Sequence, residues 1–170
     1  SKPLTDASSL DPTRTWVIDG GPQIPSLPAE AAPSLVIAAD VGYQHAVALG
    51  LSVDVVVGDF DSLAPDNLQE NYPGVLVQRH PQDKDASDLA LALRFAWTAG
   101  ATTVDVLIGG EGRLDHLLVG LMLIANEENI ERRIVTHCGP SRSVALRPGK
   151  PFDLEVTSGS WLTLLALDRD

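Results

Sequence analysis

The chain has 170 residues, of which 44% are hydrophobic and 21% charged, and this composition suits one packed domain or one domain with a small appendage. Its formal net charge is −11, and no basic patch is visible in the sequence, so nucleic acid is not expected as a partner. No apolar run approaches the ~18 residues of a membrane span, no signal peptide is visible, and the single cysteine favours a reducing, cytoplasmic compartment.

Strand-like and helix-like patterns alternate along most of the chain after a polar arm at residues 1–14. Short apolar or β-branched runs predict buried strands at 15–18, 35–39, 53–57, 75–77, 104–108 and 134–136. The stretches between them predict helices at 43–49, 65–71, 87–99 and from residue 114 onward. This order predicts an α/β domain at 15–139, with a mostly parallel sheet and helices on both faces.

Two of the expected helices carry a clear apolar stripe. In the first, Ser87 is a plausible N-cap, and the stripe comprises Leu89, Ala92, Leu93, Ala96 and Trp97. The second is strongly apolar, and the face expected to pack inward comprises Leu114, Leu117, Leu118, Leu121 and Ala125. Both helices should therefore pack on the sheet.

The pattern changes at residues 140–170. Three runs, at 143–146, 152–156 and 161–167, are joined by short turns and predict a small antiparallel β-domain, an incomplete β-sandwich. Three strands make a thin sheet, so we expect a partner subunit or further residues to cover its apolar face. A two-fold homodimer is the simplest arrangement that would do so.

The stretch at 55–62 combines an apolar β-branched run with the acidic turn Gly58-Asp59-Phe60-Asp61-Ser62. In an extended segment residues i and i+2 point the same way, so Asp59 and Asp61 should share one side and Phe60 the other. Two carboxylates that close repel each other, and a bound Mg²⁺ would relieve the repulsion because it prefers hard oxygen ligands. A polar loop whose acids cap the next helix is the alternative for this stretch alone.

Further acids follow other predicted strands. They are Asp40, the cluster at 83–88 and Asp115. The carboxyl ends of parallel strands share one edge of a sheet, where ligands of open α/β folds bind, so these acids should line one crevice. Arg113 and Lys84 are the cations in the same loops. Acids, Mg²⁺, arginine and lysine together are typical of a site that positions a polyphosphate.

Each of these residues also has a structural interpretation. Asp88 could favour a helix N-terminus electrostatically, Lys84 could be a solvated loop residue, and Arg113 could pair with Asp115. Asp19-Gly20-Gly21 is more simply an ordinary turn after a strand. The chain has no Gly-x4-Gly-Lys-Ser/Thr loop, and its first strand carries no Gly-x-Gly-x-x-Gly, which argues against a P-loop kinase and a dinucleotide-binding enzyme.

Three motifs in order, Gly58-Asp59-Phe60-Asp61-Ser62, Asp83-Lys84-Asp85-Ala86-Ser87-Asp88 and Gly112-Arg113-Leu114-Asp115-His116, resemble those of the thiamine pyrophosphokinase family. Asp40-Val41-Gly42 resembles the family's earlier Asp-Gly-Gly. The resemblance covers about residues 15–140 and implies an α/β catalytic domain followed by a β-sandwich domain. It implies transfer of pyrophosphate from ATP to the thiamine hydroxyl with release of AMP, Mg²⁺ dependence, and a homodimer with thiamine at the subunit interface.

The resemblance also implies roles for individual residues. Metal would be held by Asp59, Asp61 and Asp88, and the catalytic residues would be Asp61, Asp88 and Arg113. The nucleotide would be bound by Asp40, Gly42, Lys84, Ser87, Gly112, Arg113 and Asp115. The chain departs from the family pattern at Val41 and Ser87, and Glu111 adds bulk and charge near the expected nucleotide.

The departures keep two alternatives open. One is a related pyrophosphokinase that acts on another hydroxymethyl heterocycle, such as a pterin. The other is a non-catalytic nucleotide-binding relative, which Glu111, Val41 and the short C-terminal part favour and which the full set of metal-matched acids disfavours.

Overall fold

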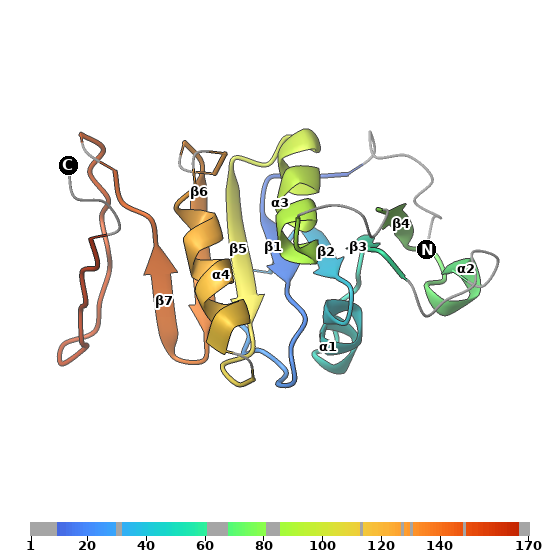
Figure 1. Ribbon diagram of the computed structural model, residues 1–170, viewed down its shortest axis with the longest axis horizontal. Helices are drawn as coiled ribbons and strands as arrows, with labels where there is room; N and C mark the ends of the chain where they lie inside the picture. Colours follow the sequence, from blue (N-terminus) through green and yellow to red (C-terminus); the bar gives the residue numbers. More distant parts are fainter. Residues whose placement is uncertain are drawn as a thin grey trace.

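The computed structural model describes residues 10–29, 32–60, 68–80, 86–112, 114–126, 128–129, 131–147 and 149–166. Its strands form one sheet in the order β4-β3-β2-β1-β5-β6-β7, in which β1 to β6 are parallel and β7 is antiparallel to β6 (Figure 1). The strands are β1 (Thr15–Ile18), β2 (Leu35–Ala39), β3 (Val55–Gly58), β4 (Leu76–Arg79), β5 (Thr103–Ile108), β6 (Arg133–Cys138) and β7 (Ser141–Val144). The helices are α1 (Gly42–Ala48), α2 (Leu68–Asn71), α3 (Asp88–Thr98) and α4 (Leu114–Ile124).

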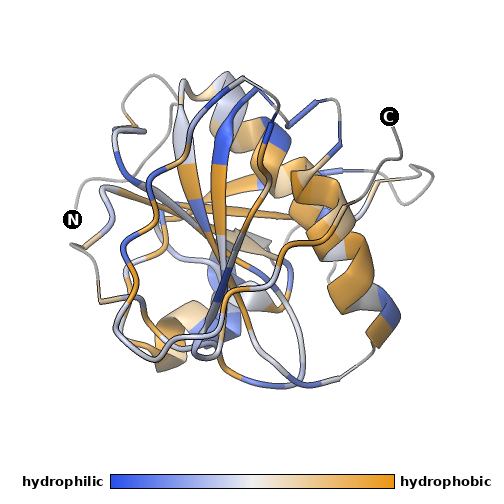
Figure 2. Cartoon of the chain, turned by 90° about the vertical axis from the view of Figure 1, so that its left-hand side faces the viewer, coloured by the Kyte–Doolittle hydropathy of each residue, from blue (hydrophilic) through white to orange (hydrophobic). Residues whose placement is uncertain are grey.

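The mostly parallel sheet predicted from the sequence is confirmed. Buried hydrophobic side chains form a core on each face of this sheet. On one side α3 packs on β1, β2 and β3, and residues of α4 complete the same cluster, which includes Val17, Ile37 and Val106. On the other side α1 packs on β1 and β2 over Trp16 and Ile18. Figure 2, which views the molecule along the sheet, shows helices on both sides. No helix among the described residues is long and apolar enough to cross a bilayer.

Helix α3 follows its predicted pattern. The Ser87 hydroxyl caps it by accepting a hydrogen bond from the Ala90 N–H (3.3 Å), and Leu89, Ala92, Leu93 and Ala96 are buried. Helix α4 is rotated relative to expectation. Leu114 and Leu118 are exposed, whereas Gly120 and Ile124 are buried. The helix is apolar nearly all round (Figure 2), so the spacing of its apolar residues did not determine which side of the helix packs on the sheet.

The C-terminal part differs from expectation beyond β7. The described residues 151–166 contain no strand, so the expected strand at 152–156 is wrong, and so is the one expected at 161–167 as far as residue 166, since residue 167 lies outside the described residues. Instead this segment lies beyond β7 at one end of the sheet (Figure 1), tied to it by a hydrogen bond from the Arg142 guanidinium to the Glu155 carbonyl (2.8 Å). Its side chains are largely solvent-exposed, and Trp161 is 98% exposed. The division of the chain at residue 140 stays a prediction.

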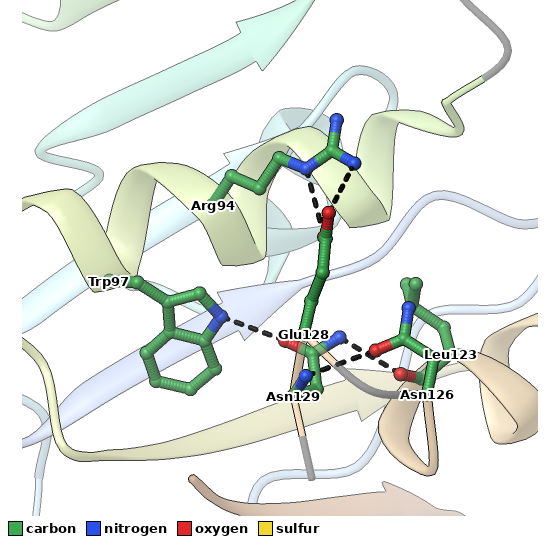
Figure 3. Close-up of polar contacts among 6 residues, drawn as sticks. All are labelled: Arg94, Trp97, Leu123, Asn126, Glu128 and Asn129. Carbon is green, nitrogen blue, oxygen red and sulfur yellow. Dashed lines mark hydrogen bonds and ion pairs between the residues drawn. The ribbon is translucent and has the colours of Figure 1, made fainter. Parts of the chain in front are cut away.

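The segment between α4 and β6 is fixed to α3 by polar contacts (Figure 3). The indole N–H of Trp97 donates to Asn129 Oδ1 (2.8 Å), and Asn129 Nδ2 donates to the Leu123 carbonyl (2.9 Å). Arg94 forms a two-pronged pair with Glu128 at 3.0 and 3.1 Å, but both side chains are more than half exposed. The buried Asn129 should therefore stabilise this contact more than the ion pair does.

Replacing Asn129 with alanine should destabilise the protein by about 3 kcal/mol, because it leaves a partly buried indole N–H and a carbonyl without their partners. For a chain of this length that corresponds to roughly 6 to 12 °C in melting temperature. Glu128→Gln is the matched control and should melt within about 2 °C of wild type, since its pair is exposed. Equal melting temperatures for the two variants would contradict the assigned role of Asn129.

Candidate active site

The topology sets where a site can form. The chain builds the sheet outward from β1 to β2, β3 and β4 on one side, and to β5 and β6 on the other. The loops at the carboxyl ends of β1 and β5 therefore meet at the point where the strand order reverses, which is where ligands bind in open α/β sheets. The backbone N–H of Asp19 donates to the Leu107 carbonyl (3.0 Å) and joins these two ends.

The structure places the described candidate residues along this carboxyl edge. Asp40 follows β2, Asp59 follows β3, Ser87 and Asp88 begin α3, and Asp115 lies in the first turn of α4. Gly42 is the first residue of α1, and Gly112 lies just before α4 with φ of 112°. Three predicted site residues lie outside the described residues, namely Asp61, Lys84 and Arg113.

Asp40 lies next to the end of β3. Its backbone N–H donates to the Val57 carbonyl (2.8 Å), and its Cβ lies 3.5 Å from where a Cβ on Gly58 would be. Burial, and then the charge of Asp40, raises the pKa of the Tyr72 hydroxyl, so that tyrosine is also near. The Arg79 guanidinium donates to the Asp59 carbonyl (3.3 Å) and joins the ends of β3 and β4. The structure therefore brings the Asp40 and Asp59 turns together.

The turn that carries Asp59 is not extended. Phe60 adopts a left-handed conformation with φ of 52°, so the alternation argument that put Asp59 and Asp61 on one side does not apply here. A left-handed conformation costs a bulky residue on the order of 1 to 3 kcal/mol. Burial offsets it, since the Phe60 side chain is 2% exposed and its ring lies 5.5 Å from that of Tyr72. The buried aromatic ring thus anchors the acidic turn.

Asp19 is a further acid at this carboxyl edge, although the sequence interpretation treated it as part of an ordinary turn. Burial, reinforced by the charge of Asp88 and opposed by a hydrogen bond from the Gly20 N–H, raises the pKa of the Asp19 carboxyl to about 6. Asp19 and Asp88 are therefore within electrostatic reach of each other. The signal was available in the sequence, because Asp19 follows β1 as Asp40 follows β2.

Asp19→Asn should stabilise the protein above pH 6. The folded pKa of about 6 exceeds the ordinary value of 3.8, so the folded state holds more protons between these values, and stability from this group falls as pH rises through that window. Above pH 6 the charged, buried carboxylate should cost about 3 kcal/mol, and the amide avoids this cost. In melts from pH 4 to 7, the advantage of the variant should grow with pH, whereas the exposed control Asp153→Asn should show none. A constant difference would contradict the assignment.

Close backbone contacts hold the glycine loops in place. A Cβ on Gly42 would lie 2.1 Å from the Ile18 carbonyl oxygen, and one on Gly109 would lie 2.0 Å from that of Gln23. The Gly110 N–H donates to Gln23 Oε1 (3.0 Å). The loop after β1 and the loop after β5 are therefore packed as one unit. Nothing in the sequence pattern indicated that Gln23 contacts Gly109 and Gly110, since these residues lie far from Gln23 in the chain.

The carboxylates of this edge suit a hard cation. Within the described ranges, no three His, Cys, Asp or Glu side chains lie close enough to hold a metal ion by themselves. Asp59 and Asp88 supply oxygen donors at the edge, and the charge of Asp88 adds to burial in raising the pKa of Asp19. This donor set fits Mg²⁺, which is bound through one or two carboxylates together with substrate phosphates.

Comparisons with known proteins agree on one family. The family described as "Thiamin pyrophosphokinase, catalytic domain" matches residues 30–136, which span α1 to α4 and most of β6. No curated protein sequence matches the chain.

Solved structures give the same result. A thiamin pyrophosphokinase family protein from Enterococcus faecalis is 27% identical, with a TM-score of 0.58, over 73% of this chain and 61% of that one. A protein from Lactobacillus plantarum is 29% identical (TM-score 0.57; 73% and 61%), and a thiamin pyrophosphokinase from Geobacillus thermodenitrificans is 27% identical (TM-score 0.56; 73% and 59%). The chain thus spans less than two thirds of the length of each of these proteins.

Proposed function

The chain belongs to the thiamin pyrophosphokinase family, and for this reason we propose that it transfers the pyrophosphoryl group of ATP to the hydroxyl of thiamine, giving thiamine diphosphate and AMP. The observation that carries the proposal is the gathering of Asp40, Asp59, Asp88 and Asp115 at one carboxyl edge, beside the reversal of strand order. A set of acids at that place suits a magnesium-bound polyphosphate substrate.

The proposed step is an in-line displacement at the β-phosphorus of ATP. The bond between the thiamine oxygen and the β-phosphorus forms, the bond from the β-phosphorus to the α,β-bridging oxygen breaks, and AMP leaves with that oxygen. The hydroxyl proton passes to a carboxylate of the edge or to water. In this proposal Arg113 would pair with phosphate oxygens through both arms of its guanidinium, and Lys84 would add a second positive charge.

Mg²⁺ would be held by Asp59, Asp61 and Asp88, and when bound it would neutralise the charge of the phosphates. The remaining nucleotide contacts would come from Asp40, Gly42, Ser87, Gly112 and Asp115. Ser87 has a structural role as well, because its hydroxyl caps α3. That cap fixes the first turn of the helix and with it the position of Asp88.

We further propose a cytoplasmic homodimer. The C-terminal segment exposes Trp161, Leu162, Leu164 and Leu165, each at least 68% exposed, and a second copy of the chain is the partner that would cover them. Light scattering at micromolar concentration should give twice the mass of the chain. A monomer would contradict this assembly.

The test of the reaction is product analysis of the full-length protein with ATP, thiamine and Mg²⁺. AMP should appear in step with thiamine diphosphate, and removal of Mg²⁺ with a chelator should stop both. ADP as product, or no turnover, would contradict the proposal. A parallel assay with a hydroxymethylpterin separates thiamine from the alternative acceptor, and nucleotide binding without turnover would indicate a binding protein.

A further inference from the structure

Gln23 lies where the loop after β1 meets the glycine-rich loop after β5, and its side chain has no part in the proposed transfer. Its carboxamide oxygen, Oε1, accepts a hydrogen bond from the Gly110 N–H (3.0 Å). Among the residues that the structure describes, this is the only hydrogen bond that joins residues 109–112 to another segment of the chain. The Gln23 side chain therefore gives this loop a polar attachment that the loop otherwise lacks.

The main chain of Gln23 packs on the same loop independently of its side chain. A Cβ on Gly109 would lie 2.0 Å from the Gln23 carbonyl oxygen and 2.8 Å from its carbonyl carbon, so the two backbones are in direct contact. At the other end of the loop, a Cβ on Gly112 would lie 2.7 and 2.8 Å from ring atoms of Pro22. A substitution at Gln23 that keeps the side-chain length should therefore remove the hydrogen bond and leave this packing intact.

The loop that Gln23 holds has unusual conformational freedom. Gly109, Gly110 and Gly112 lack a Cβ, so each can adopt backbone conformations that other residues avoid, and Gly112 does so with φ of 112°. Gly110 lies between Gln23 and the end of β6, since a Cβ on it would lie 3.6 Å from both Gln23 Oε1 and Cys138 Sγ. The hydrogen bond to Gln23 selects one conformation of this loop before any ligand binds.

We propose that Gln23 is a positioning residue whose carboxamide holds residues 109–112 in the conformation that receives the nucleotide. This inference rests on the proposed function for the identity of the ligand and for its contact with Gly112. Without the hydrogen bond, binding of Mg²⁺-ATP would also have to order the loop, and that ordering opposes binding. The loss should therefore appear as weaker nucleotide binding and not as slower chemistry.

The first measurement tests the hydrogen bond in the ligand-free protein. Gln23→Met keeps the side-chain length and removes the acceptor, Gln23→Glu keeps an acceptor oxygen, and Gln44→Met is the control at an exposed glutamine of α1. The exchange rate of the Gly110 amide proton with solvent, measured by NMR, reports this bond. The rate should rise about fivefold in Gln23→Met, the ratio that one neutral hydrogen bond supports, and stay near the wild-type rate in the other two variants.

The second measurement tests positioning, by calorimetry with Mg²⁺-ATP and by steady-state kinetics with thiamine. Gln23→Met should bind Mg²⁺-ATP about fivefold more weakly than wild type, and its KM for ATP should rise by the same factor. Its kcat and its KM for thiamine should not change. Because the hydrogen bond is solvent-exposed, the melting temperature should stay within about 2 °C of wild type. Gln44→Met should match wild type throughout, and Gln23→Glu is left out because its charge would repel phosphate.

Three results would overturn the inference. Unchanged exchange of the Gly110 amide proton in Gln23→Met would show that the hydrogen bond does not order the loop, and unchanged affinity for Mg²⁺-ATP would show that this order does not assist binding. Tighter binding by Gln23→Met would show that the carboxamide competes with the nucleotide for the Gly110 N–H. Weaker nucleotide binding by Gln23→Met without turnover of thiamine by wild type would contradict the proposed transfer only. Normal turnover with unchanged affinity would contradict this inference only.

Discussion

Replacing Gly42 with alanine should destabilise the protein by at least about 3 kcal/mol, or prevent it from folding. The added Cβ would lie 2.1 Å from the Ile18 carbonyl oxygen and 2.9 Å from its carbonyl carbon, distances at which an atom must move. Neither can move easily, because Ile18 ends β1, which is paired with β2 on one side and β5 on the other. If the variant still folds, its melting temperature should be roughly 6 to 12 °C below that of wild type.

Gly21→Ala is the matched control. It lies in the loop after β1, no heavy atom outside its own neighbourhood lies within 4 Å of an added Cβ, and its backbone is not left-handed. Its melting temperature should stay within about 2 °C of wild type. If Gly42 matters only through contact with a nucleotide, Gly42→Ala should melt like Gly21→Ala and lose only its response to ATP. That result would contradict the packing role.

Buried parallel strands were the most predictable feature, because a strand covered on both faces is a continuous apolar run. The runs at 15–18 and 35–39 match β1 and β2 residue for residue. The strand ends were less predictable where polar residues continue the pairing. β6 extends to His137 and Cys138, since His137 Nε2 lies 2.8 Å from Asp105 Oδ1 on the neighbouring strand and is satisfied there.

The C-terminal segment shows the limit of local pattern. Alternating apolar residues at 152–156 and 161–165 have strand character, but a strand also needs a neighbour with which to pair. Among the described residues after 140, only β7 joins the sheet, through pairs such as Val135 with Val144. The same limit applies to α4. Because apolar residues lie all round this helix, tertiary contacts and not the sequence pattern determine which of its faces is buried.

At the candidate site, the rule that acids follow strand ends placed Asp40, Asp59 and Asp115 correctly at one edge. It did not find what depends on distant parts of the chain. Asp19 is brought near Asp88, and Gln23 is brought to Gly110, only by the folded sheet. The left-handed turn at Phe60 is likewise a product of its burial, because aromatic residues do not favour that conformation.

Asp61→Asn should abolish most of the response to Mg²⁺-ATP while leaving the fold intact. The substitution removes one charge from the acidic turn and nearly keeps its shape, so the ligand-free variant should melt at or slightly above the wild-type temperature, as is common when a functional residue is replaced. Turnover should fall by at least about a hundredfold, because metal and phosphate positioning provide most of the catalysis of phosphoryl transfer.

The expected rise in melting temperature on ligand binding follows from thermodynamic linkage between binding and folding. A ligand at about a hundred times its dissociation constant stabilises the folded state by about 2.7 kcal/mol, which for this chain is roughly 5 to 11 °C. Wild type and the exposed control Asp153→Asn should both show this shift with Mg²⁺-ATP, and Asp61→Asn should show less than about 2 °C. If Asp61 serves only to cap or stabilise its turn, the variant should instead melt lower without ligand, by about 1 kcal/mol, and keep the full shift. Thermal melts of the three proteins with and without Mg²⁺-ATP therefore separate a metal ligand from a structural residue, and a destabilised Asp61→Asn with the full shift would exclude the metal role.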